Sequence, residues 1–480
     1  MRYHLITLGC QMNKSDSERV HTVIRGLGYE WAEQEADADL LGVLACSVRQ
    51  KAIDRVYTRI HGWNQLKDSR NLLTFVTGCV LPADKEKFLK LFDFVFSMNE
   101  LPQLPDLIRQ YGIVTPLALN PRDDGDEPPP AATVPDETPG VSTVSIEALT
   151  RGKADGRPVM DGLWQVEATP TSSFEAFVPI QNGCNKFCTF CAVPYTRGRE
   201  VSRASQAVLD DVASLVERGY KSITLLGQNV NSYGLDRPGD EISFAELLER
   251  IGQLGEGNDH RFWVYFTSPH PRDMTDDVID VMARYDCLGK QVHLPVQSGD
   301  DRVLRRMNRQ HSIGRYRKIL ERIRERMPEA TVFTDIIVGF TGETEEEFDN
   351  TLQLMEDFPF HMAYVAEYSP RPGAASSRWA DDVPHVEKRR RLHALNTALH
   401  RHAGQLNGQL VGQTIPVLVT GLHRKQQGLM GITEGKIRIL VDTQDHSLIG
   451  QFVNVSVTAA VELSLAGQLV TASRKPEALT

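Results

Sequence analysis

The sequence predicts an α/β protein of several domains: an N-terminal parallel α/β domain, a central parallel β/α barrel, complete or partial, and a small antiparallel β-barrel at the C-terminus. The chain has 480 residues, and at roughly 150 residues per domain this length suggests about three domains. Strand-like apolar runs alternate with helix-like periods through most of the chain, as in parallel α/β sheets. The tail instead shows short strands separated by glycine-rich or polar turns, which favours a small barrel.

The composition is that of an ordinary globular protein. Hydrophobic residues make up 41% and charged residues 24% of the chain, which excludes collagen-like, wholly disordered and coiled-coil proteins. The net charge of −10 argues against a surface coated with basic residues. Any contact with a nucleic acid must therefore be local.

The cysteine count and the N-terminus indicate a cytoplasmic protein. Seven cysteines are too few for a disulfide-stapled secreted scaffold, and their odd number leaves at least one unpaired. The first apolar run is too short for a signal peptide, and no stretch approaches the roughly 18 apolar residues of a membrane span. We expect a reducing compartment and no contact with a membrane.

Residues 1–115 are expected to form the first α/β domain. Tyr3–Leu8 is a short apolar run typical of a buried strand. Ser15 and Glu18 match a capping box and predict that a helix starts there, while Gly26 supplies a stop signal. The next strands are expected at Leu40–Ala45 and Leu72–Val76.

Residues 116–173 are expected to be a linker or insertion. Its first 55 residues hold nine of the 25 prolines together with an acidic, proline-rich run. Such a stretch cannot bury enough apolar surface to offset chain entropy. The apolar patch at residues 162–166 is expected to dock as a strand or a loop.

The second and third domains are expected at residues 174–404 and 405–472. Six β/α units predict a parallel barrel, whose right-handed connections would gather the loops after each strand around one mouth. The strand-like runs are Phe177–Ile180, Ser222–Leu226, Phe262–Phe266, Gln291–Pro295, Val332–Val338 and Ala363–Tyr368. A basic helical segment follows at Glu387–Gln405, and the tail strands are expected at Ile415–Val419, Leu429–Ile432, Lys436–Val441 and Phe452–Val457, with a last run to Leu465.

Three cysteines follow the first strand of the predicted barrel in a C-x3-C-x2-C spacing. They are Cys184, Cys188 and Cys191. Three thiolates on one loop can hold three irons of a cubane cluster and leave the fourth iron open to a substrate ligand. The alternative is a zinc site, but structural zinc normally takes four ligands, and no fourth cysteine or histidine lies nearby in the sequence.

Three further cysteines share a context rather than a spacing. Cys10, Cys46 and Cys79 each follow a predicted parallel strand. Because loops at the carboxyl ends of parallel strands meet at one edge of the sheet, these thiols could converge on a second cluster. Buried cysteines at strand ends are alternatively plain small hydrophobes. Cys287 has no partner at ligand spacing, so we expect a packed thiol.

These motifs resemble the radical S-adenosylmethionine (radical SAM) methylthiotransferases over nearly the whole chain. The resemblance implies that Cys184, Cys188 and Cys191 bind a [4Fe-4S] cluster whose open iron chelates SAM, and that Phe190 lies beside the adenine of SAM. It implies that Cys10, Cys46 and Cys79 hold an auxiliary [4Fe-4S] cluster, and that the tail is an RNA-binding TRAM module. One cluster would cleave SAM to a 5′-deoxyadenosyl radical, and the auxiliary cluster would carry sulfur for a methylthio group.

Within this family the motifs are most similar to the branch that acts on N6-isopentenyladenosine in tRNA. Gly-Cys10-Gln-Met-Asn and Ala-Cys46-Ser-Val-Arg carry this similarity. The sequence departs from the family pattern at Leu44-Ala45, at Thr341, which replaces a proline, and at an additional Pro269. None of these changes removes a cluster ligand. Two alternatives stay open: threonylcarbamoyladenosine in tRNA or a ribosomal-protein aspartate as the substrate, and a non-catalytic RNA-binding protein with structural metal.

Polar residues near the predicted strand ends are candidate SAM contacts. Besides Phe190, they are Gln228, Asn229, Gln297, Ser298 and Asp335. Each could instead satisfy the backbone of its own loop. Candidate basic patches for RNA are Arg302–Arg309, Lys388–Arg391, and Arg424-Lys425 with Lys436 and Arg438. The expected partners are a tRNA with an isopentenylated anticodon loop and an electron donor such as a flavodoxin or ferredoxin, and we expect a monomer.

Overall fold

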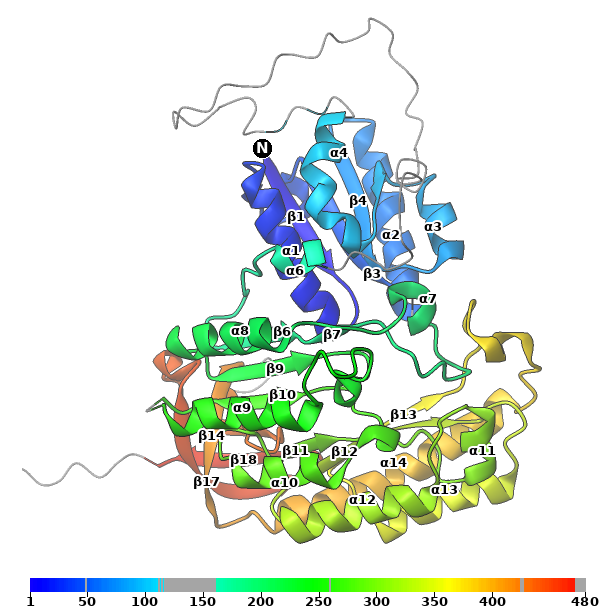
Figure 1. Cartoon of the computed structure of the whole chain (residues 1–480), viewed down its shortest axis with the longest axis vertical. Helices are drawn as coiled ribbons and strands as arrows, with labels where there is room; N and C mark the ends of the chain where they lie inside the picture. The colour runs from blue at the N-terminus through cyan, green and yellow to red at the C-terminus, as the bar shows by residue number, and fades with distance from the viewer. Residues whose placement is uncertain are drawn as a thin grey trace, which may run out of the picture.

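The computed structural model describes residues 1–47, 50–110, 113, 115, 161–258, 260–423 and 427–470. Figure 1 shows an α/β domain standing over the open edge of a second, larger α/β unit, with a small barrel beside that unit. Most of the proline-rich stretch, and Arg424-Lys425 of the third basic patch, lie outside the described residues. The expected fold class is confirmed: a parallel α/β domain, a partial β/α barrel and a small C-terminal β-barrel.

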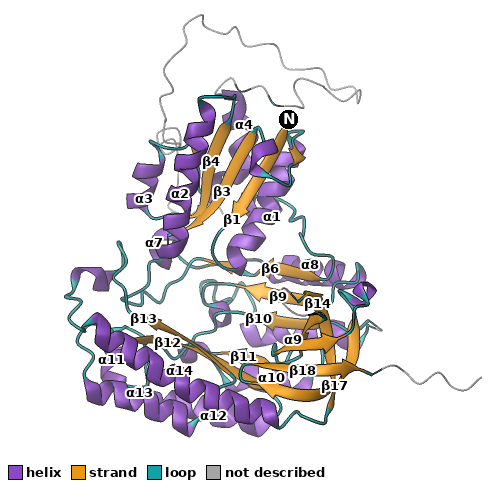
Figure 2. Ribbon diagram, turned by 180° about the vertical axis from the view of Figure 1, so that it is seen from behind, coloured by secondary structure: helices purple, strands orange, loops and turns teal. Residues whose placement is uncertain are grey.

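The N-terminal domain is a parallel five-stranded sheet with the order β2-β1-β3-β4-β5. All seven residues of β3 are buried, because helices cover both faces of the sheet (Figure 2). The strands are β1 (Arg2–Thr7), β2 (Glu30–Trp31), β3 (Leu40–Cys46), β4 (Leu73–Cys79) and β5 (Phe94–Val95), and the helices are α1 (Gln11–Gly26), α2 (Gln50–Lys67), α3 (Pro82–Phe88) and α4 (Leu104–Gln110). The predicted strands and the end of the first helix are confirmed.

The predicted start of α1 at Ser15 is wrong. The helix begins at Gln11 with Cys10 as its N-cap residue, so Ser15 and Glu18 lie inside it. Both are buried, because the polar side of α1 packs against β6 of the second domain and because residues 169–171 contact Glu18. Local sequence suggested a cap where the molecule has an interdomain contact.

Residues 162–166 dock as a helix, not as the expected strand or loop. Helix α6 (Asp161–Gln165) places Leu163 in the core of the N-terminal domain. The following segment is tied to α1, since Thr169 N donates to Glu18 O at 3.5 Å and Thr171 N donates to Glu18 Oε1 at 3.1 Å. The chain therefore re-enters the described structure along the N-terminal domain.

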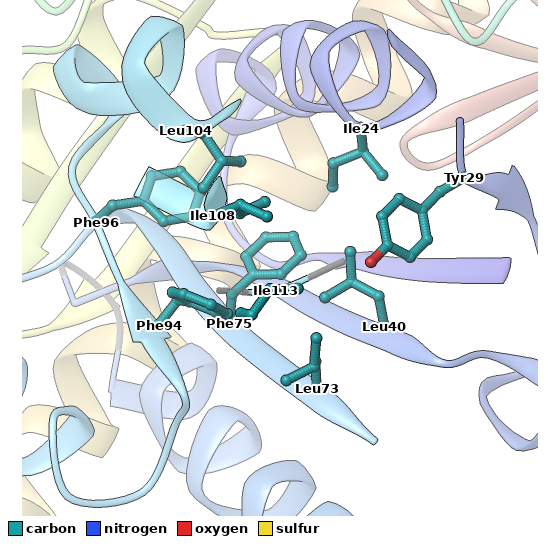
Figure 3. A pocket seen from close by; sticks show the side chains of 10 residues that line it. All are labelled: Ile24, Tyr29, Leu40, Leu73, Phe75, Phe94, Phe96, Leu104, Ile108 and Ile113. Carbon is teal, nitrogen blue, oxygen red and sulfur yellow. The ribbon is translucent and has the colours of Figure 1, made fainter. Parts of the chain in front are cut away.

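A small apolar pocket lies inside the N-terminal domain, between the sheet and helices α1 and α4 (Figure 3). Its walls are core side chains such as Phe75, Phe96 and Ile108. Apart from the hydroxyl of Tyr29, these side chains offer no polar group to a ligand. The pocket is part of the domain core, away from the strand ends that carry the cysteines.

The central domain is a partial barrel. One sheet has the order β10-β9-β6 and the other β11-β12-β13, and a parallel bridge between Val264 and Leu288 joins them. No pairing joins β6 to β13 among the described residues, so the barrel stays open there. The strands are β6 (Glu175–Pro179), β7 (Gln181–Asn182), β8 (Val201–Ser202), β9 (Ser222–Leu226), β10 (Trp263–Phe266), β11 (Gln291–His293), β12 (Thr331–Val338) and β13 (Met362–Glu367).

Helices cover the outer face of this barrel (Figure 2). Alternate strand residues, including Ile223, Val264 and Ile336, point to these helices and form the largest core. These helices are α8 (Ser205–Glu217), α9 (Phe244–Glu256), α10 (Asp276–Arg284), α11 (Asp301–Arg306), α12 (Ile313–Arg326), α13 (Glu345–Asp357) and α14 (His385–Gly408). The short helix α7 (Val193–Arg197) packs instead against β4 of the N-terminal domain. The other strand residues face the lumen.

The tail forms a closed five-stranded barrel. The expected antiparallel pairing is confirmed except at one place, because β16 and β18 run parallel. The strands are β14 (Thr414–Leu422), β15 (Leu429–Thr433), β16 (Arg438–Asp442), β17 (Phe452–Val461) and β18 (Ser464–Leu469). Leu418 packs on Trp263 and Tyr265, so the tail barrel covers the amino end of the lumen. None of the helices in the described part of the chain has the length and apolar character of a membrane span.

Candidate active site between two domains

The three N-terminal cysteines meet at one edge of the first sheet. Cys46 and Cys79 end β3 and β4 and lie directly opposite each other in the strand register. Cys10 follows β1, the neighbour of β3, and is the N-cap residue of α1. A thiolate at the N-terminus of a helix faces the positive end of the helix dipole. The predicted convergence of these residues therefore has a structural basis.

Two glycines allow the close approach of these loops. Gly9 and Gly78 have φ values of +126° and +101°, which side chains rarely adopt. A Cβ atom on Gly9 would lie 2.9 Å from the Cβ of Cys46, and one on Gly78 would lie 2.7 Å from the carbonyl oxygen of Ala45. Glycine is therefore required before Cys10 and before Cys79, because a side chain would have no room there and because φ is positive.

Asn13 joins two of the cysteine loops. Its fully buried side chain donates from Nδ2 to Leu8 O at 2.7 Å and to Ala45 O at 2.8 Å. These carbonyls belong to the segments that carry Cys10 and Cys46. Asn13 thus fixes the spacing of the loops, a role that the sequence analysis did not assign to it.

Arg197 connects the two groups of cysteines. It ends α7, just after the Cys184–Cys191 loop, and α7 packs against β4. Its Nε donates to Cys79 Sγ at 2.8 Å, and its Nη2 lies 2.6 Å from Asp16 Oδ2. Its Nη1 donates to Asn182 Oδ1 at 3.1 Å. The Arg197 side chain is 7% exposed and that of Asp16 is 4% exposed, so this ion pair is a buried link between the domains.

Burial dominates the electrostatics of Cys79. Loss of solvent raises the pKa of its thiol to about 12, and the Arg197 guanidinium opposes this rise. The neighbouring Cys10 and Cys46 thiols raise the pKa of Cys79 further. A bound metal centre would favour the thiolates that burial alone disfavours.

The second group of cysteines lies on a loop between β7 and α7. Gly183, with φ +82°, has no room for a Cβ because Arg199 O would lie 2.0 Å away. Gly183 N donates to Gln228 Oε1 at 2.5 Å, and Cys191 N donates to Cys188 O at 3.0 Å. Asn308 Nδ2 holds the middle of the loop by donating to Phe187 O at 3.0 Å.

Burial raises the pKa of the Cys184 thiol to about 11 and that of the Cys191 thiol to about 12. Cys188 adds to both rises. Arg309 Nη1 lies 3.6 Å from Cys188 Sγ and Nη2 donates to Pro295 O at 2.6 Å. A buried cation therefore stands beside this group as Arg197 does beside the other.

The donor sets suit iron–sulfur clusters. Each group offers three cysteine sulfurs from one side, with a buried arginine nearby. In the described residues no set of three or more His, Cys, Asp or Glu side chains is gathered around a single metal-ion position. Ligands of a cubane need not meet at one ion, because each thiolate binds a different iron.

The predicted SAM contacts lie near the mouth of the barrel but differ in availability. Phe190 packs beside Val303, Met307, Phe340 and Tyr368, and Gln228 supports Gly183. Gln297 has a φ of +74°, an unusual value that often marks functional positions. The Ser298 hydroxyl accepts from Asp300 N at 3.2 Å and pairs with Thr351. Asp335 lies beside His293.

Sequence reasoning named Asn229 but missed two histidines with buried ring nitrogens, His270 and His311. Asn229 Oδ1, His270 Nε2 and His311 Nε2 are buried and have no hydrogen-bond partner in the described structure. The two histidine rings lie 5.6 Å apart. Burial lowers the pKa of His311 to about 4 and lowers that of His270 further. Neutral imidazoles with unpaired atoms are fitted to hold a polar ligand; the sequence signal was a histidine between two prolines.

Two predicted basic patches are largely neutralised. Arg306 binds Glu347 at 2.6 Å, and Arg390 binds Glu345 at 2.5 Å and Glu387 at 2.6 Å. In the third patch Lys436 lies 4.0 Å from the centre of the Tyr265 ring, whereas Arg438 is exposed.

Cys287 packs against the main core, as expected.

Comparison with known proteins agrees with this arrangement. Residues 2–98 match the uncharacterized protein family UPF0004, residues 178–355 match the Radical SAM superfamily and residues 408–470 match the TRAM domain. A tRNA-2-methylthio-N(6)-dimethylallyladenosine synthase of Yersinia enterocolitica serotype O:8 / biotype 1B is 36% identical and covers 98% of this chain and 92% of its own length. A synthase of the same name from Thermoanaerobacter sp. strain X514 is 34% identical over the same shares.

The chain belongs to the tRNA-2-methylthio-N(6)-dimethylallyladenosine synthase family. This confirms the predicted radical SAM methylthiotransferase, whose family implies a [4Fe-4S] cluster and SAM. Among solved structures, the radical SAM methyltransferase TsrM from Kitasatospora setae, with tryptophan and a SAM analogue bound, has a TM-score of 0.50 at 13% identity. It covers 89% of this chain and 80% of that chain, and this likeness concerns the fold alone.

Proposed function

We propose that this enzyme methylthiolates carbon 2 of N6-isopentenyladenosine next to the anticodon of tRNA, with SAM as methyl donor and radical source. The product is 2-methylthio-N6-isopentenyladenosine. The names of the relatives support this substrate. The structural observation that carries the proposal is Arg197, which donates to Cys79 Sγ of the first cysteine group and to Asn182, two residues before Cys184 of the second group.

The cysteines are the proposed cluster ligands. Cys184, Cys188 and Cys191 would hold one [4Fe-4S] cluster, and Cys10, Cys46 and Cys79 would hold a second. When bound, these clusters and SAM supply the radical, sulfur and methyl chemistry that replaces an unactivated C–H bond. Burial excludes water from Cys46, Cys79, Cys184 and Cys188, whereas Cys10 is exposed. Arg197 and Arg309 place fixed positive charge beside Cys79 and Cys188.

The proposed SAM site lies beside the Cys184–Cys191 loop. Phe190, Gln228, Asn229 and Gln297 border it, and the unpaired Asn229 Oδ1 is available to the ligand. Ser298 belongs to the same strand ends, although its hydroxyl is used within the protein. Asp335, the fifth of the eight residues of β12, lies deeper in the barrel. Asn229 Nδ2 donates to Asp273 Oδ2 at 3.2 Å, and Lys186 pairs with Asp273 at 2.5 Å. These bonds would orient the Asn229 amide toward the ligand.

We propose a division into residues 1–115, which carry the auxiliary centre, 116–173 as linker, 174–404 as the radical SAM domain and 405–472 as the TRAM module. The TRAM match supports a tRNA substrate. An electron donor such as a flavodoxin or ferredoxin would reduce the clusters. We propose that the enzyme acts as a monomer in the cytoplasm.

Iron content tests the two centres. After anaerobic reconstitution we expect about eight irons per chain and about four in the Cys184/Cys188/Cys191→Ala variant. The matched Cys10/Cys46/Cys79→Ala variant should also keep about four. Cys287→Ala, which removes a packed thiol, is the control and should keep eight. A wild type with four irons that vanish in the first variant would contradict sulfur insertion.

The product tests the substrate. Mass spectrometry of digested tRNA after turnover should show a methylthio group on isopentenyladenosine. The same mass increase on threonylcarbamoyladenosine instead would assign the enzyme to the other tRNA branch. Modification of a ribosomal-protein aspartate would contradict tRNA as the substrate.

A further inference from the structure

Three side chains on the lumen face of the barrel are not explained by the clusters or by the core. They are His293, Asp335 and Tyr364, from the adjacent strands β11, β12 and β13. Asp335 pairs with Tyr364 in the strand register, and Phe333, two residues before Asp335, pairs with His293. The residues between them, Val292, Ile336, Ala363 and Val365, belong to the core under the helices. The three side chains therefore share the opposite face, which lines the lumen.

Tyr364 is a large aromatic ring that the protein leaves uncovered. It is 51% exposed, although it lies in the middle of a strand. Its ring centre is 5.5 Å from that of His293, and β13 is the edge strand on the open side of the barrel. Exposed aromatic rings in such openings are suited to stack on planar ligands.

His293 and Asp335 add hydrogen-bonding groups beside the ring. His293 Nε2 lies 3.0 Å from Asp335 Oδ2. Nε2 is buried and has no aligned hydrogen bond within the described structure. The imidazole and the carboxylate therefore retain hydrogen-bonding capacity for a ligand that lies against Tyr364.

The tail barrel contributes positive charge at the same place. Burial and Asp335 raise the pKa of the Tyr364 hydroxyl, whereas Arg438 of β16 opposes the rise. Arg438 lies three residues after Gly435, whose carbonyl oxygen accepts from Thr331 Oγ1 of β12 at 2.6 Å, and it is exposed. A guanidinium beside a stacking ring can contact a phosphate of the same nucleotide.

The group lies one layer below the proposed SAM site. Ile337, two residues after Asp335 on the same face of β12, packs against the apolar cluster that also receives Phe190. Two residues of a strand span about 7 Å. A purine on Tyr364 would therefore lie just below the loop that carries Cys191.

We propose that His293, Asp335 and Tyr364 form the binding site for the target purine, which leaves the RNA stack and lies on Tyr364. The edge of the base meets His293 and Asp335, and Arg438 contacts the adjoining phosphate. This assignment rests on the proposed function and adds the position of the substrate base. Enzymes that modify a base commonly take it out of the stack and place it against aromatic side chains.

A double-mutant cycle between protein and RNA tests this contact. The RNAs are two anticodon stem-loops, one with isopentenyladenosine at the target position and one abasic there. Wild type and Tyr364→Ala are compared by fluorescence anisotropy under anaerobic conditions, with reconstituted full-length enzyme. Tyr364→Ala should weaken binding of the first RNA about 5- to 150-fold. It should not weaken binding of the abasic RNA, because the partner of the ring is already missing.

Matched variants define the role further. Tyr364→Phe keeps the ring and should retain wild-type affinity. Tyr195→Ala removes an equally exposed tyrosine, 50% against 51%, from α7 rather than from the lumen, and should leave the cycle unchanged. His293→Gln and Asp335→Asn should lower kcat more than they raise KM, since they orient a base that Tyr364 already holds.

The outcomes separate the site from the function. Equal losses for both RNAs with Tyr364→Ala would overturn the proposed site, as would full activity of that variant. Wild type that binds the stem-loop without forming a methylthiolated product would instead contradict the proposed function.

Discussion

At the scale of single residues, the cysteines were predictable and their supports were not. Cysteines at a motif spacing, or at the ends of predicted strands, can be recognised in sequence. Asn13 and Arg197 have no such signal, because most of their partners lie 32 to 184 residues away in the chain. The bonds of Asn13 to Leu8 and Ala45 form when the N-terminal domain folds. Those of Arg197 to Cys79 and Asp16 form only once the two domains meet.

Arg197→Gln should strongly destabilise the N-terminal domain. The change leaves the buried Asp16 carboxylate without its ionic partner, which costs about 3–5 kcal/mol of unfolding free energy. Denaturant unfolding of the metal-free protein measures this loss, and the Arg197→Gln/Asp16→Asn double variant should recover part of it. Arg250→Gln breaks an exposed pair with Glu246 and should cost under about 1 kcal/mol. Similar losses for both arginines would contradict the buried link.

Gly78→Ala should be more damaging than the same change at another left-handed glycine. Gly78 and Gly412 both have positive φ. A Cβ atom added to Gly78 would lie 2.7 Å from Ala45 O, whereas a Cβ atom added to Gly412 would have no neighbour within 4 Å. We expect a strain cost of about 1–3 kcal/mol at Gly412 and a larger loss at Gly78. Thermal unfolding and iron content measure this difference. An equal shift with retained iron would show that the loop has room.

At the scale of elements, strands were predicted better than helix ends. The strands consist of continuous apolar runs, so their burial can be predicted from the sequence. The start of α1 was misplaced because Ser15 and Glu18 form a plausible cap, whereas the actual cap is Cys10. Glu18 is buried by its contact with residues 169–171, and that contact cannot be read from local sequence.

Glu18 should make stability depend on pH. Burial raises its pKa to about 7, above the unfolded value of about 4.3. Between these values the folded state binds more protons than the unfolded state, so this residue lowers stability as pH rises from about 4 to 7, by up to about 3 kcal/mol. Glu18→Gln should therefore gain stability relative to wild type over this range and show a constant difference above pH 8.

Denaturant unfolding at several pH values checks this expectation. Glu33→Gln, an exposed change in the same domain, controls for the loss of one carboxylate. A stability difference between Glu18→Gln and wild type that does not change with pH would contradict a protonated Glu18 in the folded protein.

At the scale of the whole molecule, the sequence predicted the three folded domains but not the contacts between them. The apolar lumen face of β10 is covered by Leu418 and Phe452 of the tail barrel, with the Trp263 and Phe452 rings 4.6 Å apart. The basic runs read as RNA patches lie mostly in ion pairs with acidic residues from other elements. Pairing between distant elements decides which charges remain available, so charge runs in the sequence overestimated the RNA surface.

The salt dependence of RNA binding should reveal which arginines remain available. Each phosphate contact adds about 0.7 to 0.9 to the slope of log affinity against log salt. Arg438→Gln should lower the slope by about that amount, because Arg438 is exposed and has no ion pair among the described residues. Arg390→Gln should leave the slope unchanged, because Glu345 and Glu387 already neutralise Arg390. Titrations of a tRNA anticodon stem-loop at four salt concentrations measure both slopes. If the slope falls with Arg390→Gln but not with Arg438→Gln, the RNA binds α14 and not the tail barrel and lumen edge.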